Sequence, residues 1–588
     1  MVIKNNIASA FMKNADIAAI FYSIADILEI QRVQWKPIAY RKAARTIESL
    51  SEDIEEIYKK GGLKALERIP GVGERLARKI EEFIMTGKVK EYERLKEEMP
   101  AGLGDLVSIP GLGPKKAYRL FKELRIRGTK DLEKAIREHR IEKLGGFGAK
   151  SEENISKALK LVQTGQERTL LGVALPIAEL IVGRLGKIKG VERIEAAGSL
   201  RRRAETVGDI DILVTAEDSG PIMDAFVEMP EVIQVLAKGP TKSAVILRHG
   251  QHTIQSDVRV IEDRSFGAAL QYFTGNKEHN IALRRIAIKK WYKLSEYGVF
   301  DRKGKMIAGD TEEAVYKALS VPWIPPELRE NRGEIEASMK GGLPELVELS
   351  DIRGDLQMHT TWSDGANSIS EMVKAAEALG YEYIAITDHS KSERVANGMD
   401  EERLIRYIKA VRAAAKQSRK VKVLAGAEVD ITANGELDYP DECLRQLDFV
   451  SVAIHSRFKS TKEEMTGRIL AGLSNKYVKV FCHPTGRLIH QREPYAVDMD
   501  KVIEEAAQRG IALEIDAFPD RLDLNDVDVK KAIEGGAKIA IGTDAHHADQ
   551  LMYMQYGVFM ARRGWAERKD IINTYSFKEL CRHLGLNL

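Results

Sequence analysis

Two aspartates, Asp209 and Asp211, lie within an apolar stretch of the chain. Ile210, Ile212 and Val214 alternate with them, and this period of two predicts a β-strand with both carboxylates on one face. Such carboxylates lie roughly 7 Å apart and repel each other unless a cation lies between them. Mg²⁺ binds a few carboxylates and keeps positions for substrate phosphates. The pattern therefore predicts a metal site that acts on a phosphorylated substrate.

The residues just before this strand are suited to bind phosphates. Gly198 and Ser199 predict a tight turn that offers backbone N–H groups and a hydroxyl to a triphosphate. Positive charge follows at Arg201, Arg202 and Arg203. A second alternating strand, residues 254–260, supplies Asp257 as a third inward carboxylate. Capping aspartates on a solvated strand would explain a lone Asp-x-Asp, but the combined pattern favours a nucleotide site.

This arrangement resembles the nucleotidyltransferase palm of family X DNA polymerases, the DNA polymerase β group. The matching residues are the Gly-Ser-x-Arg-Arg turn, the Gly-Asp-x-Asp strand and the later strand aspartate. The resemblance implies an α+β palm over residues 166–260, in which Mg²⁺ or Mn²⁺ assists attack of a primer 3′-hydroxyl on a dNTP. It implies that the catalytic metal ligands are Asp209, Asp211 and Asp257. It implies that the triphosphate is bound by Gly198, Ser199, Arg202 and Gly208.

The composition indicates a multidomain protein that is not embedded in a membrane. The chain has 588 residues, too many for a single core, with 30% charged and 44% hydrophobic residues. No apolar run reaches the roughly 18 residues of a membrane span. The three cysteines, Cys443, Cys482 and Cys581, have no Cys-x-x-Cys spacing, which suggests a reducing compartment. Together with the resemblance, this predicts a cytoplasmic, nucleoid-associated monomer.

The N-terminal part reads as an all-α region that binds DNA. Residues 1–150 contain 30 Lys and Arg against 22 Asp and Glu, which suits a polyanionic partner. A Pro-Gly-x-Gly turn at 70–73 recurs at 110–113, with a looser copy at 144–150. One such turn could be an ordinary helix–helix corner, but two predict helix-hairpin-helix motifs that bind duplex phosphates without sequence preference. Their glycines are Gly71, Gly73, Gly111 and Gly113.

This region resembles the small lyase domain (1–95) and the fingers subdomain (96–165) of polymerase β-like enzymes. The segment 40–44 and the first hairpin carry the resemblance. It implies that Lys79 is the amine that forms a Schiff base with an abasic sugar, giving 5′-dRP lyase activity. The alternative is a lysine that only binds phosphate. The DNA-binding residues implied here are the four hairpin glycines with Tyr40, Arg75 and Lys115.

Residues 261–320 resemble the nucleotide-selection (thumb) subdomain of the same family through Tyr-Phe-Thr-Gly at 272–275. The resemblance implies that Tyr272 and Phe273 lie against the deoxyribose, although both could instead be core residues. It implies further contacts by Gly275 with the nucleotide, Asn280 with the base edge and Arg284 with the template minor groove. The Pro-rich segment that follows predicts a linker over 321–348 that is stiff at its start.

From about residue 350, short apolar strands alternate with amphipathic helices, which predicts a parallel barrel. Polar residues follow the strands, where barrel active sites lie. A lone histidine there is usually structural, but this many suggests bound Zn²⁺, Mn²⁺ or Fe²⁺. The set resembles the PHP (polymerase and histidinol phosphatase) domain, a distorted (β/α)₇ barrel with a trinuclear site, over 349–588. The implied ligands are His359, Asp364, His389, Glu428, His455, His483, Asp544 and His546. The family has a histidine where this chain has Gln357.

The sequence therefore predicts a prokaryotic-type family X DNA polymerase that acts on gapped or nicked duplex DNA with dNTPs. The palm is expected to fill short gaps in base-excision or end-joining repair. The PHP domain is expected to remove nucleotides from 3′ ends as a 3′→5′ exonuclease. Two alternatives stay open: template-independent tailing of ends, and a PHP domain that Gln357 has weakened into a scaffold.

Overall fold

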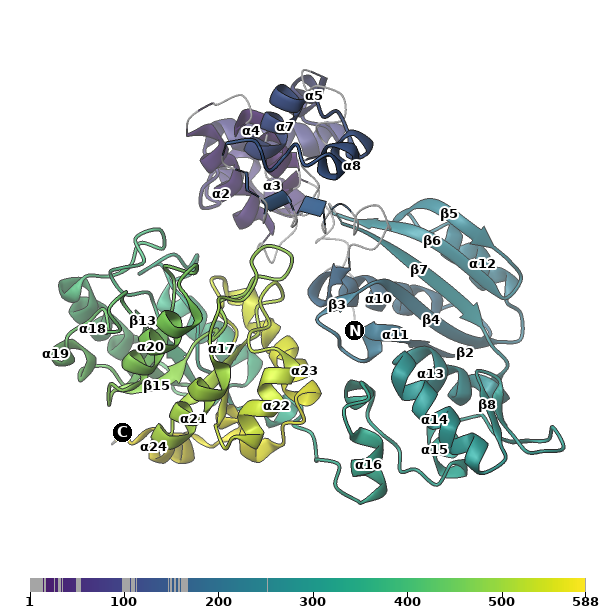
Figure 1. Cartoon of the computed structure of the whole chain (residues 1–588). Coiled ribbons are helices and arrows are strands. Elements are labelled where there is room, and N and C mark those ends of the chain that lie inside the picture. Colours follow the sequence, from purple (N-terminus) through teal and green to yellow (C-terminus); the bar gives the residue numbers. More distant parts are fainter. Residues whose placement is uncertain are drawn as a thin grey trace. The chain divides into compact units, whose positions relative to one another are not determined.

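The computed structural model describes most of the chain. The described residues are 14, 17–18, 20–25, 27–29, 33, 35–48, 54–97, 106, 112, 114–145, 147–148, 151–152, 155–156, 159, 168–250 and 252–586. The chain forms two compact units, one of residues 1–168 with 248–253 and the other of 169–247 with 254–588 (Figure 1). None of the described helices combines the length and the apolar character that a membrane span needs.

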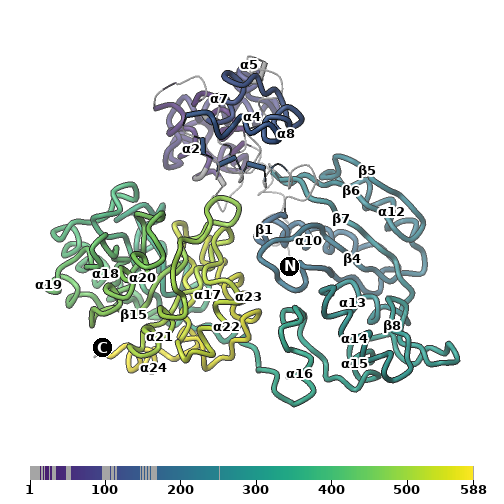
Figure 2. Tube along the Cα trace, in the orientation of Figure 1, coloured from purple at the N-terminus to yellow at the C-terminus, as the bar shows by residue number. Residues whose placement is uncertain are grey.

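The first unit is helical, as expected. Its helices, traced in purple to dark blue in Figure 2, are α2 (Lys36–Glu48), α3 (Ile54–Leu66), α4 (Glu74–Thr86), α5 (Lys90–Glu97), α7 (Pro114–Leu124) and α8 (Thr129–Arg137). They surround two separate apolar clusters, one within 17–95 and one within 106–159. The first hairpin joins α3 to α4 through Gly71, whose φ of +82° favours glycine. Gly111 and Gly113 of the second hairpin lie outside the described residues, as does the side chain of Lys115.

The palm is a five-stranded sheet in the order β2-β4-β7-β6-β5. Its elements are β1 (Thr169–Leu170), α10 (Leu171–Leu185), β2 (Val191–Ala196), α11 (Gly198–Arg201), β3 (Thr206–Val207), β4 (Asp209–Ala216), α12 (Gly220–Val227), β5 (Val232–Lys238), β6 (Lys242–His249) and β7 (His252–Val260). One face of β4 buries Ile210, Ile212 and Val214 in the apolar core shared with α10 and α12. The carboxylates of the same strand therefore lie on the opposite face.

The thumb follows as α13 (Phe266–Thr274), α14 (Lys277–Lys289) and α15 (Glu312–Ala318) with a small sheet. The other elements are η1 (Asp263–Ser265), β8 (Lys293–Ser295), β9 (Gly298–Phe300) and β10 (Met306–Ala308). Gly267 lets α13 approach the start of α15, because a Cβ there would lie 2.1–2.4 Å from the Thr311 backbone. The expected linker 321–348 contains η2 (Pro326–Leu328) and α16 (Glu334–Met339), and its Ile324 and Leu328 are buried in the thumb core.

The C-terminal part is a parallel sheet of seven strands in chain order, β11 to β17. The strands are β11 (Gly354–Asp355), β12 (Tyr383–Ile386), β13 (Lys422–Asp430), β14 (Phe449–Ala453), β15 (Val478–Phe481), β16 (Ala512–Asp516) and β17 (Ile539–Gly542). A parallel bridge between Met358 and Ala545 brings the first and last strands together. The sheet therefore nearly closes into the expected barrel.

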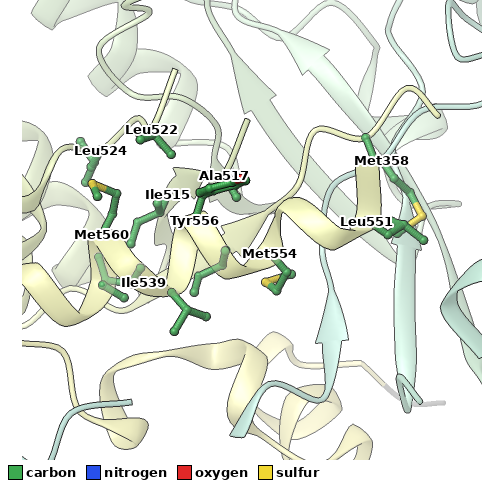
Figure 3. Close-up of a cluster of buried hydrophobic side chains, with 14 of the residues drawn as sticks. Met358, Ile515, Ala517, Leu522, Leu524, Ile539, Leu551, Met554, Tyr556 and Met560 are labelled. Carbon is green, nitrogen blue, oxygen red and sulfur yellow. The ribbon is translucent and has the colours of Figure 1, made fainter. Parts of the chain in front are cut away.

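Helices precede, connect and follow the barrel strands. They are α17 (Ile369–Leu379), α18 (Glu401–Gln417), α19 (Asp441–Leu444), α20 (Lys462–Leu473), α21 (Met499–Arg509), α22 (Asp526–Glu534), α23 (Met554–Arg563) and α24 (Phe577–Leu584), with η3 (Leu349–Asp351), η4 (Ala548–Tyr553), η5 (Arg568–Asp570) and η6 (Ile572–Thr574). Apolar side chains of α23, including Met554 and Met560, pack on Ile515 and Ile539 of the last strands (Figure 3). The expected fold class is confirmed in the helical, palm and barrel parts.

Candidate active sites

The palm brings three carboxylates together on two neighbouring strands. β4 and β7 are parallel, and their register pairs Asp211 with Asp257 and Asp209 with Gln255. Asp209 is exposed, whereas Asp257 is buried. Burial, with the charges of Asp209 and Asp257, raises the pKa of Asp211 to about 7. A cation in this position would remove that repulsion, so the geometry fits the expected pair of divalent metals.

Basic and amide groups from the sheet contact the third carboxylate. Lys242 Nζ lies 2.8 Å from Asp257 Oδ2, and Gln255 Nε2 donates to Asp257 Oδ1 at 2.9 Å. Arg259 Nη2 is farther away, at 4.0 Å. The sequence interpretation missed Lys242, because it lies on a different strand with no recognisable spacing to the aspartates. Its position fits a residue that holds the Asp257 carboxylate in place.

The Gly198–Ser199 turn lies directly beside these carboxylates. The Ala197 amide donates to the Asp211 carbonyl at 2.8 Å, which fixes the start of α11 against β4. Gly198 has a φ of +65°, and a Cβ there would lie 3.1 Å from Asp211 Oδ2. Glycine is therefore required both by the backbone and by the close carboxylate. Binding of a phosphate by this turn stays a prediction.

The two arginines after this turn reach into the thumb. Arg202 Nη1 donates to the Thr274 carbonyl at 2.5 Å, and its Nε lies 3.0 Å from Glu330 Oε1. Arg201 forms a bidentate pair with Glu312, both distances being 2.8 Å. Arg202, expected at the triphosphate, is thus paired with a carboxylate in this conformation. To contact a triphosphate, Arg202 would have to release Glu330 and bind the phosphate instead.

Replacing Glu312 by glutamine should lower the free energy of unfolding by about 3–5 kcal/mol, because it leaves the fully buried Arg329 without a charged partner. Burial opposes ionisation of Glu312, but Arg329 and Arg201 lower its pKa from 4.5 to about 2. The folded pKa is below the unfolded one, so this stabilisation is present above pH 4.5 and disappears as the pH falls toward 2. Urea unfolding at several pH values measures it.

The exposed neighbour Glu313, replaced by glutamine, is the matched control and should leave stability nearly unchanged. The difference between wild type and Glu312→Gln should shrink below pH 4.5. A difference that stays constant across the acid range would contradict a role for the Glu312 charge.

The aromatic pair of the thumb lies at the end of α13. Arg284 stacks over the Tyr272 ring at 5.5 Å and Arg259 over the Phe273 ring at 4.6 Å, and both aromatic side chains are half-buried. The Asn280 side chain turns inward: Nδ2 donates to the Tyr272 carbonyl at 2.7 Å, and Oδ1 accepts from Gln271 at 2.7 Å. Asn280 therefore fixes the aromatic turn in this conformation.

In the helical unit, the candidate nucleophile Lys79 lies close to two polar side chains. Lys79 Nζ lies 2.7 Å from Glu91 Oε2, and the Tyr40 hydroxyl donates to the same oxygen at 2.9 Å. Glu91, which the sequence interpretation missed, therefore holds Lys79 beside Tyr40. Gly71, Gly73 and Arg75 are exposed, as a phosphate-binding hairpin requires.

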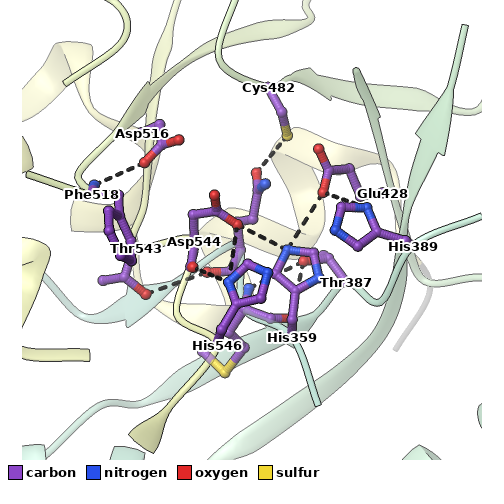
Figure 4. Close-up of polar contacts among 12 residues, drawn as sticks. His359, Thr387, His389, Glu428, Cys482, Asp516, Phe518, Thr543, Asp544 and His546 are labelled. Atoms are coloured by element: carbon purple, nitrogen blue, oxygen red, sulfur yellow. Dashed lines mark hydrogen bonds and ion pairs between the residues drawn. The ribbon is translucent and has the colours of Figure 1, made fainter. Parts of the chain in front are cut away.

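In the barrel, the expected ligands gather where the strands end (Figure 4). Glu428 at the end of β13 is the centre, because four imidazoles contact its two oxygens. The distances are 2.8 Å to His483 Nε2, 3.2 Å to His389 Nδ1, 3.3 Å to His455 Nε2 and 3.4 Å to His359 Nε2. Burial opposes ionisation, but the charge of His455 and hydrogen bonds from His455 and His483 hold the pKa of Glu428 well below its usual range.

A second group adjoins the first. His546 Nε2 lies 3.3 Å and His389 Nε2 3.7 Å from Asp364 Oδ1, and His359 Nε2 lies 3.0 Å from Asp544 Oδ1. His359 stacks between the His389 and His546 rings, at centroid distances of 4.3 and 4.4 Å. All eight expected ligands are thus brought together. Their mixed nitrogen and oxygen donors fit Zn²⁺, Mn²⁺ or Fe²⁺.

Buried carboxylates outside the expected set position these ligands. Asp430 Oδ1 lies 2.8 Å from His455 Nδ1, which orients the ring so that Nε2 faces Glu428. Asp388 accepts from the hydroxyls of Thr360 at 2.7 Å and Ser363 at 2.6 Å, and so shapes the loop that carries Asp364. Both aspartates lie within two residues of a ligand, and that adjacency is the sequence signal that could have identified them.

Family models match four parts of the chain. They are described as a helix-hairpin-helix domain (residues 12–89), a SAM-like helix-hairpin-helix tandem (103–161), the DNA polymerase beta thumb (269–330) and the PHP domain (355–518). These matches follow the order that the sequence motifs predict. They cover the helical unit, the thumb and most of the barrel strands.

Curated relatives give the same result. The chain is 38% identical over 578 residues to "DNA polymerase/3'-5' exonuclease PolX" of Bacillus subtilis (strain 168), covering 98% of this chain and all of that one. It is 25% identical over 333 residues to DNA polymerase lambda of Rattus norvegicus, covering 52% of this chain and 54% of that protein. A probable phosphatase of Acetivibrio thermocellus is 32% identical over 201 residues, 33% of this chain and 78% of that protein. The chain therefore belongs to the family X DNA polymerases that carry a PHP domain.

Proposed function

We propose that this protein is a DNA polymerase that fills short gaps in duplex DNA and, through its PHP domain, a 3′→5′ exonuclease. The observation that carries the polymerase assignment is the register of β4 with β7, which sets Asp211 beside Asp257 with Asp209 at the strand edge. Full-length similarity to the Bacillus enzyme supports both activities. We expect the protein to be a monomer. With gapped chromosomal DNA as its substrate, it would act at the nucleoid.

In the palm, Asp209, Asp211 and Asp257 would hold Mg²⁺ or Mn²⁺. The ions would lower the pKa of the primer hydroxyl and neutralise charge on the leaving pyrophosphate. The Gly198–Ser199 turn would offer its N–H groups and hydroxyl to the triphosphate. Tyr272 and Phe273, held by Arg284 and Arg259, would lie against the sugar and disfavour a 2′-hydroxyl.

In the barrel, the eight imidazole and carboxylate ligands would hold Zn²⁺, Mn²⁺ or Fe²⁺, and such ions activate water for attack on a phosphodiester. Asp430 orients His455, and four imidazoles contact Glu428, so the ligands are positioned before any ion binds. Burial lowers the pKa of His389 to about 3, which keeps its imidazole neutral and able to bind metal. The proposed substrate is a DNA 3′ end.

One experiment tests the polymerase proposal against the tailing alternative. Labelled primers are extended with Mg²⁺ and each dNTP alone or all four together, on a short-gapped duplex and as single strands. Template-directed filling predicts that only the complementary dNTP is added and that single strands are extended poorly. Tailing predicts addition without a template. The duplex-binding hairpin and the aromatic turn favour the first outcome.

A third activity is proposed for the helical unit. Lys79→Ala should abolish borohydride trapping of the protein on a pre-incised abasic site, because its amine would form the imine. Glu91, which also accepts from the Tyr40 hydroxyl, pairs with this amine and holds it in one position. Lys90→Ala, which removes a highly exposed lysine of the next helix, is the control. Undiminished trapping in Lys79→Ala would reject the lyase assignment.

A further inference from the structure

Gln357 lies in a buried polar environment next to the barrel site. Its side chain is fully buried. One terminal amide atom lies 2.5 Å from Cys482 Sγ. With nitrogen at that position, the amide donates to both Glu514 oxygens, at 2.5 and 3.2 Å. Gly542 makes room for this contact, because a Cβ there would lie 2.2 Å from Glu514 Oε1 and 2.7 Å from Gln357 Cβ. The amide is thus bound to protein groups rather than free to bind a metal.

Arg521 brings a fixed positive charge to the same end of the site. Its side chain is mostly buried, and its Nε lies 3.3 Å from Asp516 Oδ2 and 3.9 Å from Asp544 Oδ2. Asp544 in turn contacts His359 through its other oxygen at 3.0 Å. Arg521 Nη1 has no hydrogen-bond partner within the described part of the chain. The guanidinium therefore places one fixed positive charge beside both Asp516 and Asp544.

These two features act on one metal position, that of His359, Glu428 and Asp544, whose ligand atoms lie within 4.8 Å of one another. Gln357 removes an imidazole ligand from it, and Arg521 competes with a metal for Asp544. The other two groups are His359–Asp364–His389–His546 and His389–Glu428–His455, whereas the ion pairs of Arg521 are with Asp516 and Asp544. The residues therefore fit two of the three metal positions.

We propose that the PHP centre of this chain binds two metal ions firmly and that Arg521 supplies the positive charge of the third. The proposal rests on the exonuclease function proposed above, but metal content and activity are measured separately. A protein that holds two ions and leaves DNA ends intact would refute the exonuclease and leave this inference standing. Because the guanidinium is covalently fixed, its charge would persist when the metal supply is low.

The test counts metal in the full-length chain. All samples carry Asp257→Asn to disable the palm, are loaded with excess Mn²⁺ and desalted, and are analysed by inductively coupled plasma mass spectrometry against amino-acid analysis. We expect two ions per chain in this parent protein. Arg521→Gln should raise the count above two, and adding Gln357→His should bring it to three, whereas Arg521→Lys, which keeps the charge, should stay at two.

Three ions in the parent protein would overturn the proposal, and this result depends on no change at the buried site. A count that remains two in both Arg521→Gln and the double variant would also overturn it. If Arg521→Gln has no effect and only the double variant with Gln357→His gains the third ion, the charge substitution by Arg521 is wrong. Circular dichroism of each variant verifies that the barrel is folded.

Discussion

Asp257→Ala should abolish dNTP incorporation, by on the order of 10³-fold or more, while gapped-DNA binding stays close to wild type. The carboxylate lies beside Asp211 in the parallel register of β4 and β7 and is buried. Its removal leaves the metal pair with two carboxylates. The binding surfaces proposed for DNA lie on other elements, so affinity should change little. Single-nucleotide gap filling, together with gel-shift titration of the same DNA, measures both quantities.

The charge changes of this variant call for a matched control. Asp224→Ala also removes one palm carboxylate, but Asp224 is exposed on α12 and pairs with Lys238. It should fill gaps at the wild-type rate. Incorporation by Asp257→Ala at that same rate would reject the palm assignment. Loss of DNA binding in Asp257→Ala would instead indicate that the carboxylate supports the fold rather than the chemistry.

The barrel and its ligands could be predicted because their signal is local. Most of the expected ligands lie at or just after the end of a short apolar strand, and parallel strands bring their carboxyl ends to one edge. Glu428 and His483 come from different strands and are in contact at 2.8 Å. Asp209 and Asp211 could be predicted for a similar reason, because their alternation with Ile210 and Ile212 determines the face of the strand on which they lie.

The remaining features depend on contacts between distant parts of the chain. Arg202 pairs with Glu330, 128 residues away, and Gln357 contacts Cys482, 125 residues away. No periodicity relates such residues, and their meeting is decided by how the strands and helices pack. The inward turn of Asn280 likewise depends on Gln271, a neighbour nine positions away across the α13–α14 turn. The composition of residues 321–348 predicts a linker, whereas Ile324 and Leu328 of this segment pack in the thumb core.

His389→Ala should eliminate Mn²⁺-dependent release of nucleotides from a DNA 3′ end. His389 belongs to two metal groups at once: Nδ1 lies 3.2 Å from Glu428, and Nε2 lies 3.7 Å from Asp364. Its loss therefore removes a nitrogen donor from both, and a drop on the order of 10²-fold or more in exonuclease rate is expected. Release of labelled 3′ nucleotides, without dNTPs, measures it.

The control for His389→Ala is a variant at a histidine that is not a proposed metal ligand. His490→Ala removes an exposed imidazole of the same domain and should keep wild-type exonuclease activity. Gap filling by His389→Ala should also be unchanged, because its palm residues are intact. If wild type and His389→Ala are equally inert on 3′ ends, the PHP domain is a scaffold. If both are equally active, the hydrolytic site lies elsewhere. Only a selective loss in His389→Ala assigns the exonuclease to the cluster around Glu428.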